Sequence, residues 1–347
     1  MTIMAATLSV STEYLAESTS PTVHAVMWLS AGLALIFVSL RTYVRLYLKR
    51  VFGYDDALAI VAMLILVAYS AVTSVAASKG LGAHFELVAQ NPQNLIDVAL
   101  LCDIGEVLAI MACTLGKTSF AVTLLRIVVQ EWIIRLLWFI IATMNLVNTL
   151  AAIFVFAQCE DPRHLWNPSI PSDCWPVYVF TQFSLFVGSY SGAQDFVFVI
   201  LAWIVVWRLE MRKQERLGIL LSMSLGLFAG AASVVKTTYL VALSQKSDFT
   251  WELAPLLWWA AVEDALTIIA ASIPTLRPIL QKIVPSFSSR PTDYQLKDIT
   301  KSTVLGSRFR KIESSTTLKV GYSKQNSNED GSVKSILERQ GEGQSRG

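Results

Sequence analysis

Charged side chains are scarce in this sequence. Only 16% of its 347 residues are Asp, Glu, Lys or Arg, whereas a soluble domain usually contains about 25%. Histidine and cysteine are also few, at three and four residues. Their spacing forms no CxxC pair and no zinc-ligand set, and the chain has neither a phosphate-binding loop nor a nucleophile elbow. We therefore expect neither an ordinary soluble domain nor a metal site, and we expect no nucleic-acid partner.

Long apolar runs are present instead. A hydrocarbon core about 30 Å thick is crossed by roughly 20 helical residues, and seven runs reach that length. They do not alternate apolar with polar residues, so a β-barrel is excluded, and only helices can pair their backbone groups within lipid. The sequence predicts an all-α membrane protein, a bundle of seven transmembrane helices surrounded by the lipid bilayer. The predicted spans are 24–46, 57–78, 98–126, 133–157, 177–207, 217–243 and 253–276.

Basic residues gather in alternate connections between these spans. The other loops contain one basic residue each, Lys79, Arg163 and Lys246. Because Lys and Arg accumulate on the cytosolic side, we expect the N-terminus outside and the C-terminal tail in the cytosol. An N-terminus found in the cytosol would contradict this orientation. The basic residues of the predicted cytosolic connections are Arg41, Arg45, Lys49, Arg50, Arg126, Arg135, Arg208, Arg212, Lys213, Arg216, Arg277, Lys282 and Arg290.

The composition divides the chain into three parts. Residues 1–23 are polar and contain no Lys or Arg, and we expect them on the extracellular or lumenal side. Residues 24–285 form the transmembrane domain. Residues 286–347 are rich in Ser, Thr, Lys, Gly and Gln, which predicts a disordered cytosolic tail. Two interpretations of the tail stay open: phosphorylation and binding to anionic lipid, or a solvated segment with no specific role.

Two of the four cysteines, Cys159 and Cys174, lie in the outer loop between the fourth and fifth spans. That compartment is oxidising, so we expect a disulfide between them. The alternative is a bridge from Cys102, near the outer end of the third span, to one of the two.

Ionisable residues inside the spans are the main functional signal. A charge at the centre of a membrane helix costs about 2.5–3.5 kcal/mol, so it normally faces inward and has a partner. We expect an outer cluster of Glu106, Lys236 and Glu263 or Asp264, and an inner pair of Lys117 with Asp195. Such clusters either fix the helix register or form a ligand pocket or proton path. The candidate residues are Asp103, Glu106, Lys117, Asp195, Lys236, Glu263 and Asp264.

Several short motifs, in this order and spacing, resemble the fungal rhodopsin-domain family over about residues 25–282. The resemblance implies seven helices. Some members are similar to fungal receptors thought to sense surfaces, and others occur in secondary-metabolite gene clusters. The motifs are GYDD at 53–56, GLGAH at 80–84, Lys117 with LLR at 124–126, Cys159, Trp166 and Cys174, Asp195, GLFAG at 226–230, and Glu263 with PTLRP at 274–278.

Despite the family's name, we expect no retinal and no other cofactor. Retinal is attached through a Schiff base to a lysine, which lies on the seventh helix of known opsins. The seventh span contains Glu263 and Asp264 but no lysine between Leu253 and Leu276. Lys117 and Lys236 are the only lysines deep in any predicted span, and neither lies where that chemistry is expected.

Two functions follow from these observations. The first is a receptor-like protein of the plasma membrane or an endomembrane, which binds a small lipophilic ligand in the outer half of the bundle and contacts a cytosolic signalling partner through its inner loops. The second is a membrane-embedded enzyme or accessory protein of secondary metabolism. In that case Glu106, Glu263 or Asp264 would act as acid or base on a pathway intermediate. Transport is disfavoured because the chain shows no internal repeat. The sequence alone identifies no catalytic residue.

Overall fold

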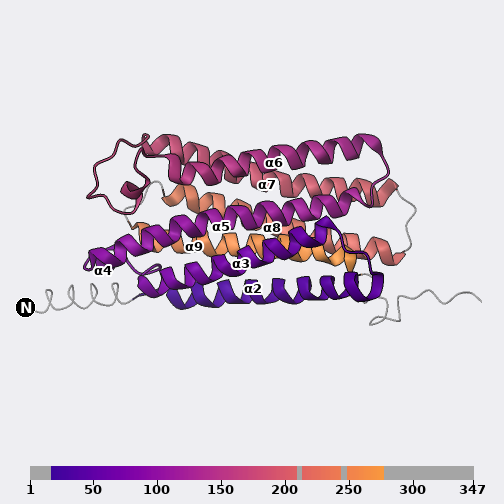
Figure 1. The fold of residues 1–347 in the computed structure, drawn as a ribbon, viewed down its shortest axis with the longest axis horizontal. Helices are drawn as coiled ribbons and strands as arrows, with labels where there is room; N and C mark the ends of the chain where they lie inside the picture. Colours follow the sequence, from indigo (N-terminus) through magenta and orange to yellow (C-terminus); the bar gives the residue numbers. More distant parts are fainter. Residues whose placement is uncertain (1–16, 209–212, 244–247, 277–347) are drawn as a thin grey trace, which may run out of the picture. The chain divides into compact units, whose positions relative to one another are not determined.

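The computed structural model describes residues 17–208, 213–243 and 248–276, and this part of the chain contains seven long helices and no strands (Figure 1). All seven are long and apolar enough to cross a membrane, so the expected seven-helix membrane bundle is confirmed. The orientation of the termini stays a prediction, and the tail at 286–347 and most of 1–23 lie outside the described residues. The long helices are α2 (Ser20–Tyr43), α3 (Tyr54–Lys79), α5 (Pro92–Leu125), α6 (Glu131–Ala157), α7 (Val177–Arg208), α8 (Lys213–Leu243) and α9 (Phe249–Ser272). The short helices are η1 (Val44–Lys49), α4 (Phe85–Val88), η2 (Pro162–Leu165) and η3 (Ile273–Thr275).

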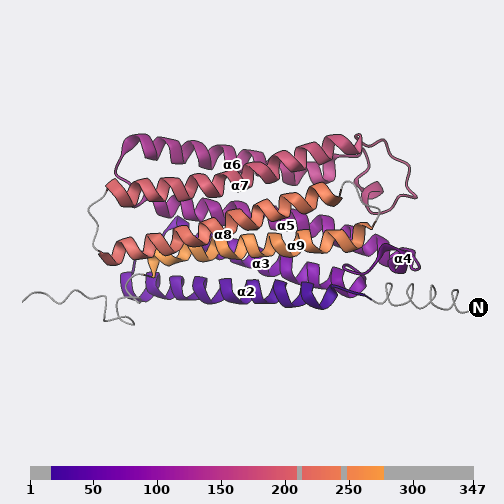
Figure 2. The same cartoon turned by 180° about the vertical axis from the view of Figure 1, so that it is seen from behind.

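Helix α9 has the most buried position in the bundle. Figures 1 and 2 show α2 and α6 on opposite sides, with α3, α5, α8 and α9 between them. Helix α9 packs against α2, α3, α5 and α8. Within the most apolar 18 residues of α9, 72% are buried, against 33–50% in the corresponding stretches of the other six helices. A charged residue on α9 therefore faces neighbouring helices rather than lipid.

Six of the seven long helices begin earlier than the apolar runs suggest, all but α7, and the early starts of α5 and α9 matter most for the site. Helix α5 starts at Pro92 rather than at residue 98, because the Asn91 side chain caps it by accepting a hydrogen bond from the Gln93 backbone N–H at 3.2 Å. Its 34 residues span about 51 Å, more than the hydrocarbon core, so its first turns extend beyond the lipid tails. Helix α9 starts at Phe249, four residues before the predicted start at 253.

The loop after α3 joins three helices at one end of the bundle. Thr19 donates its backbone N–H to the Gly82 carbonyl at 2.8 Å, and Gly82 donates to the Thr250 carbonyl at 3.1 Å. His84 Nδ1 lies 2.5 Å from Asp248 Oδ2, just before α9. Gly82 has a φ of +86°, and a Cβ there would lie 2.6 Å from the Thr19 hydroxyl. Glycine at this position thus allows α2, α3 and α9 to meet.

The loop between α6 and α7 lies at the same end (Figure 1). A disulfide joins Cys159 to Cys174 across it. The chain on either side pairs as well, since Glu160 donates its N–H to the Asp173 carbonyl at 3.1 Å. Cys102 is free and buried, so the structure has the pairing that we preferred and not the alternative through Cys102.

Small residues bring α7 and α8 close together. A Cβ on Gly192 would lie 3.0 Å from the Ser233 hydroxyl oxygen, and one on Gly230 would lie 3.4 Å from Asp195 Cβ. Helices in lipid associate largely by packing, and small residues allow a close backbone approach. This approach helps to place the charged residues of α7 and α8 within reach of α5 and α9.

We therefore expect Gly192→Val to destabilise the protein by about 1–3 kcal/mol, because the added carbons must separate α7 from α8. The thermal unfolding midpoint of the purified protein in detergent measures the effect. Gly32→Val is the matched control, since no atom lies within 4 Å of a Cβ built on Gly32. Equal losses in the two variants would contradict the close α7–α8 contact.

Candidate functional site

A network of buried charges joins α5, α7, α8 and α9 in the middle of the bundle. Lys117 Nζ donates to Asp195 Oδ2 at 3.0 Å and to Glu263 Oε1 at 3.3 Å. It also donates to the Ser191 carbonyl at 2.9 Å and to the Ser191 hydroxyl at 2.8 Å. On the other side of the same carboxylate, Lys236 Nζ donates to Glu263 Oε2 at 2.5 Å. Glu263 thus connects two lysines from two different helices.

The structure contains both expected pairs, Lys117 with Asp195 and Lys236 with Glu263, but the expectation that they are separate is wrong, because Glu263 also contacts Lys117. We estimated depth from the ends of the apolar runs, and the earlier start of α9 at Phe249 moves Glu263 from the outer half of its helix into the inner half, toward Lys117. A lysine side chain is also long and flexible, so Lys117 reaches across the gap that the sequence suggested. The outer and inner residues therefore form one network.

The charges of this network balance in a region with little access to solvent. Lys117 is 1% exposed and Glu263 is fully buried, and the side chain of Lys236 is 22% exposed. With Asp195, the network contains two cations and two carboxylates. A buried ion pair gains little net stability because its charges lose their hydration, but removal of one partner leaves an unpaired charge and is strongly destabilising.

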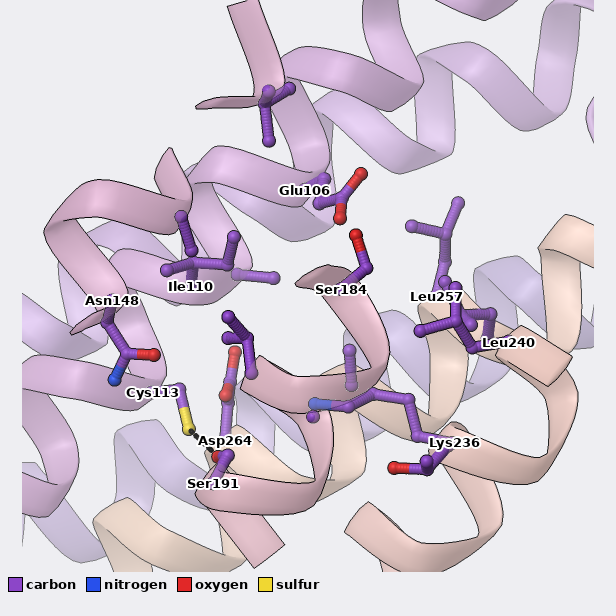
Figure 3. A pocket seen from close by; sticks show the side chains of 18 of the residues that line it. Glu106, Ile110, Cys113, Asn148, Ser184, Ser191, Lys236, Leu240, Leu257 and Asp264 are labelled. Atoms are coloured by element: carbon purple, nitrogen blue, oxygen red, sulfur yellow. Dashed lines mark hydrogen bonds between the residues drawn. The ribbon is translucent and has the colours of Figure 1, made fainter. Parts of the chain in front are cut away.

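A cavity of about 110 Å³ lies directly beside the network (Figure 3). Residues of α3, α5, α6, α7, α8 and α9 line it. On α6 and α9 the lining residues lie toward the end with the Cys159–Cys174 loop, which the charge distribution predicts to be outside. Its walls are mainly apolar, while Figure 3 shows polar side chains from several helices around it. The polar lining includes Glu106, Asn148, Ser184, Ser191, Lys236 and Asp264.

The remaining sequence candidates differ in their relation to this cavity. Asp264 is 2% exposed and lines the cavity, and within the described part of the chain its Oδ2 atom has no hydrogen-bond partner. Glu106 is half-buried and also lines the cavity. Asp103, one turn earlier on α5, is not among the lining residues. The structure thus brings six of the seven candidates to the network or the cavity and leaves Asp103 outside both.

A second charged cluster lies at the opposite end of the bundle, and the sequence analysis missed it. Arg41 donates to Asp55 at 2.7 Å and to Asp56 at 2.8 Å, and Arg45 contacts the same two carboxylates at 3.0 and 3.2 Å. Arg126, after α5, lies 2.6 Å from Asp55. We used the arginines only as topology signals and the aspartates only as a motif. The sequence did contain a signal for this cluster. Two arginines four residues apart share one helix face, and an Asp-Asp pair follows ten residues later.

The arginine–aspartate cluster also contacts α9. Arg41 Nη1 donates to the carbonyl of Ala271, in the last turn of that helix. Arg41 and both aspartates are buried, whereas the Arg126 side chain is 37% exposed. Helix α9 therefore contributes to both charged regions, through Glu263 in its middle and through its backbone near its end.

The donor set at the cavity suits hydrogen bonding and charge pairing rather than metal binding. Among the described residues, no group of three or more His, Cys, Asp or Glu side chains is arranged to hold a metal ion. The cavity offers carboxyl, hydroxyl, amide and ammonium groups beside aromatic and aliphatic walls.

Comparisons with known proteins agree with the motifs. Residues 40–282 match the fungal rhodopsin domain. The chain is 27% identical over 152 residues to "Fugralins biosynthesis cluster protein 2" of Gibberella zeae. The aligned region covers 44% of this chain and 36% of that protein. It is 26% identical over 215 residues to a "SAT4 family membrane protein" of Emericella nidulans, and this alignment covers 60% of this chain and 52% of the relative. The chain thus spans about half or less of these relatives. No solved structure matches it.

We expect Lys117→Met to lower the free energy of unfolding by about 3–5 kcal/mol, because it leaves Asp195 buried without its cation. Lys236→Met should cost less, since this side chain is partly exposed and Glu263 keeps Lys117 as a partner. Thermal unfolding in detergent or nanodiscs compares the two variants.

The double variant Lys117→Met with Asp195→Asn tests whether the loss comes from the unpaired carboxylate. It should recover part of the stability that Lys117→Met loses. Strictly additive losses would show that Lys117 and Asp195 do not depend on each other.

Proposed function

Because the chain belongs to the fungal rhodopsin domain family and is a multi-pass membrane protein, we propose that it is a receptor-like binder of a small lipophilic molecule. The cavity beside the Lys117–Glu263–Lys236 network carries this proposal. Ligand sites are typically concave and apolar, with a few polar groups that fix the orientation of the ligand. Buried ionisable residues within membrane helices are also frequent functional positions.

The position of the cavity suits a lipophilic ligand. Its walls include Phe180, Phe183, Leu240 and Leu256, which offer aromatic and aliphatic surface. It lies in the half of the bundle that we predict to be outer, so a ligand could arrive from the lipid or from the extracellular or lumenal side. Lys236 and Asp264 lie at the cavity on α8 and α9, two of the four helices that meet at the network.

Helix α9 offers a physical route from the cavity to the predicted cytosolic end. A ligand that changes the Lys236–Glu263 contact would act on α9. The last turn of this helix is bonded to Arg41 in the arginine–aspartate cluster. Small helix shifts at such an interface are a common mode of signalling. A cytosolic signalling partner would then contact the connections beside this cluster.

A role in secondary metabolism is the second candidate, and the printed name of the Gibberella zeae relative favours it. In that case the cavity would hold a pathway intermediate, and Glu106, Glu263 or Asp264 would supply a proton donor or acceptor. Deletion of the gene followed by metabolite profiling separates the two functions. A missing product in a Glu106→Gln strain with unchanged protein abundance would favour chemistry over signalling.

A cavity-filling variant tests ligand binding directly. We expect Ala151→Phe to abolish binding of 2-(4-fluorophenyl)ethanol to the protein in nanodiscs, measured by fluorine NMR, because the new ring occupies the cavity that Ala151 lines. Ala152→Phe is the matched control, since the next residue on α6 is not among the lining residues. Equal binding by the two variants would contradict the assignment of the site.

A further inference from the structure

The charged groups around the cavity contain more acid than base. In the network, Lys117 and Lys236 are balanced by Asp195 and Glu263. The cavity is lined by two further acidic residues, Glu106 and Asp264, and among its described lining residues Lys236 is the only basic one. A ligand that enters this cavity therefore meets carboxyl groups that the protein's own cations do not balance.

Asp264 is the carboxyl group with the clearest need for a partner. It is almost fully buried on α9, and its Oδ2 atom has no hydrogen-bond partner in the described part of the chain. The nearby Lys236 ammonium donates to Glu263 instead. A buried polar atom without a partner costs free energy. A hydrogen-bond donor on the ligand would remove that cost.

The walls of the cavity favour a ligand with a compact apolar body. Phe180 and Phe183 of α7 lie on the lining together with Leu240 and Leu256. Aromatic faces attract cations as well as hydrocarbon. The volume of about 110 Å³ suits a group of roughly the size of a benzene ring.

We infer that the ligand is a small lipophilic amine, whose protonated nitrogen donates to Asp264 and whose apolar part contacts the walls. This inference rests on the proposed function, because it assigns the ligand class of the same cavity. A carboxylate ligand has no proton to donate to Asp264 Oδ2. A neutral alcohol could donate a hydrogen bond to Asp264 but could not form an ion pair with it.

Four matched probes test this inference on the full-length protein in nanodiscs at neutral pH. They share one fluorophenyl group and differ at the other end: 2-(4-fluorophenyl)ethylamine, 2-(4-fluorophenyl)ethanol, 4-fluorophenylacetate and 1-ethyl-4-fluorobenzene. Fluorine NMR titration gives each dissociation constant. We expect the amine to bind at least tenfold more tightly than the alcohol, and the carboxylate to bind more weakly than either.

The variant Asp264→Asn should remove the preference for the amine and leave the affinity of the ethylbenzene probe within about twofold. Asp103→Asn is the control, because Asp103 is an acid on α5 that does not line the cavity, and it should keep the preference. A preference that survives Asp264→Asn would overturn the inference. If this variant does not fold, the probe series on the unaltered protein decides.

The outcomes separate this inference from the proposed function. Equal affinities for the amine and the alcohol, or tighter binding of the carboxylate, would reject an amine ligand while the cavity remained a binding site. Failure of all four probes to bind, with no difference between the unaltered protein and Ala151→Phe, would reject the cavity as a site and the inference with it.

Discussion

The double ion pair at Glu263 is the interaction on which the rest of the bundle depends. Charges inside a bilayer need partners within the protein, because lipid tails cannot solvate them. Glu263 lies 3.3 Å from Lys117 and 2.5 Å from Lys236, and Lys117 also holds Asp195. Helices α5, α7, α8 and α9 must therefore keep one register and rotation. The glycines on α7 and α8 allow this arrangement by letting their backbones approach closely.

The same arrangement produces the cavity. Glu263 engages both lysines, and its neighbour Asp264 lies at the cavity with Oδ2 unpartnered among the described residues. The polar groups beside the network and the apolar side chains of α6 and α7 thus line a single space. A purely structural role would require only the balanced network. The additional acids at the cavity are the feature that this role does not explain.

Helix α9 connects the two charged regions of the protein. Its middle carries the network, four of its residues between Leu256 and Asp264 line the cavity, and its last turn accepts a hydrogen bond from Arg41 in the arginine–aspartate cluster. Both regions are linked through one packed helix, which is the route that the proposed signalling would take. The family match and the two fungal relatives support a membrane protein of this kind, and the chemistry of the cavity supports a small lipophilic ligand.

The sequence by itself determined the solvent and the number of helices, because spans of about 20 apolar residues have few alternatives in lipid. It also indicated the Cys159–Cys174 pairing and the inward-facing charges, since an oxidising loop and the cost of lipid-exposed charge restrict both. It further predicted the pairs Lys117–Asp195 and Lys236–Glu263, and only the tertiary structure showed that Glu263 joins them into one network. Helices α5 and α9 start at Pro92 and Phe249, which lie before the apolar runs, and a lysine side chain reaches across more than one turn. Residue counting therefore separated Lys117 from Glu263. It also did not find the partners of Arg41, and it could not show that Asp264 Oδ2 has no hydrogen-bond partner among the described residues.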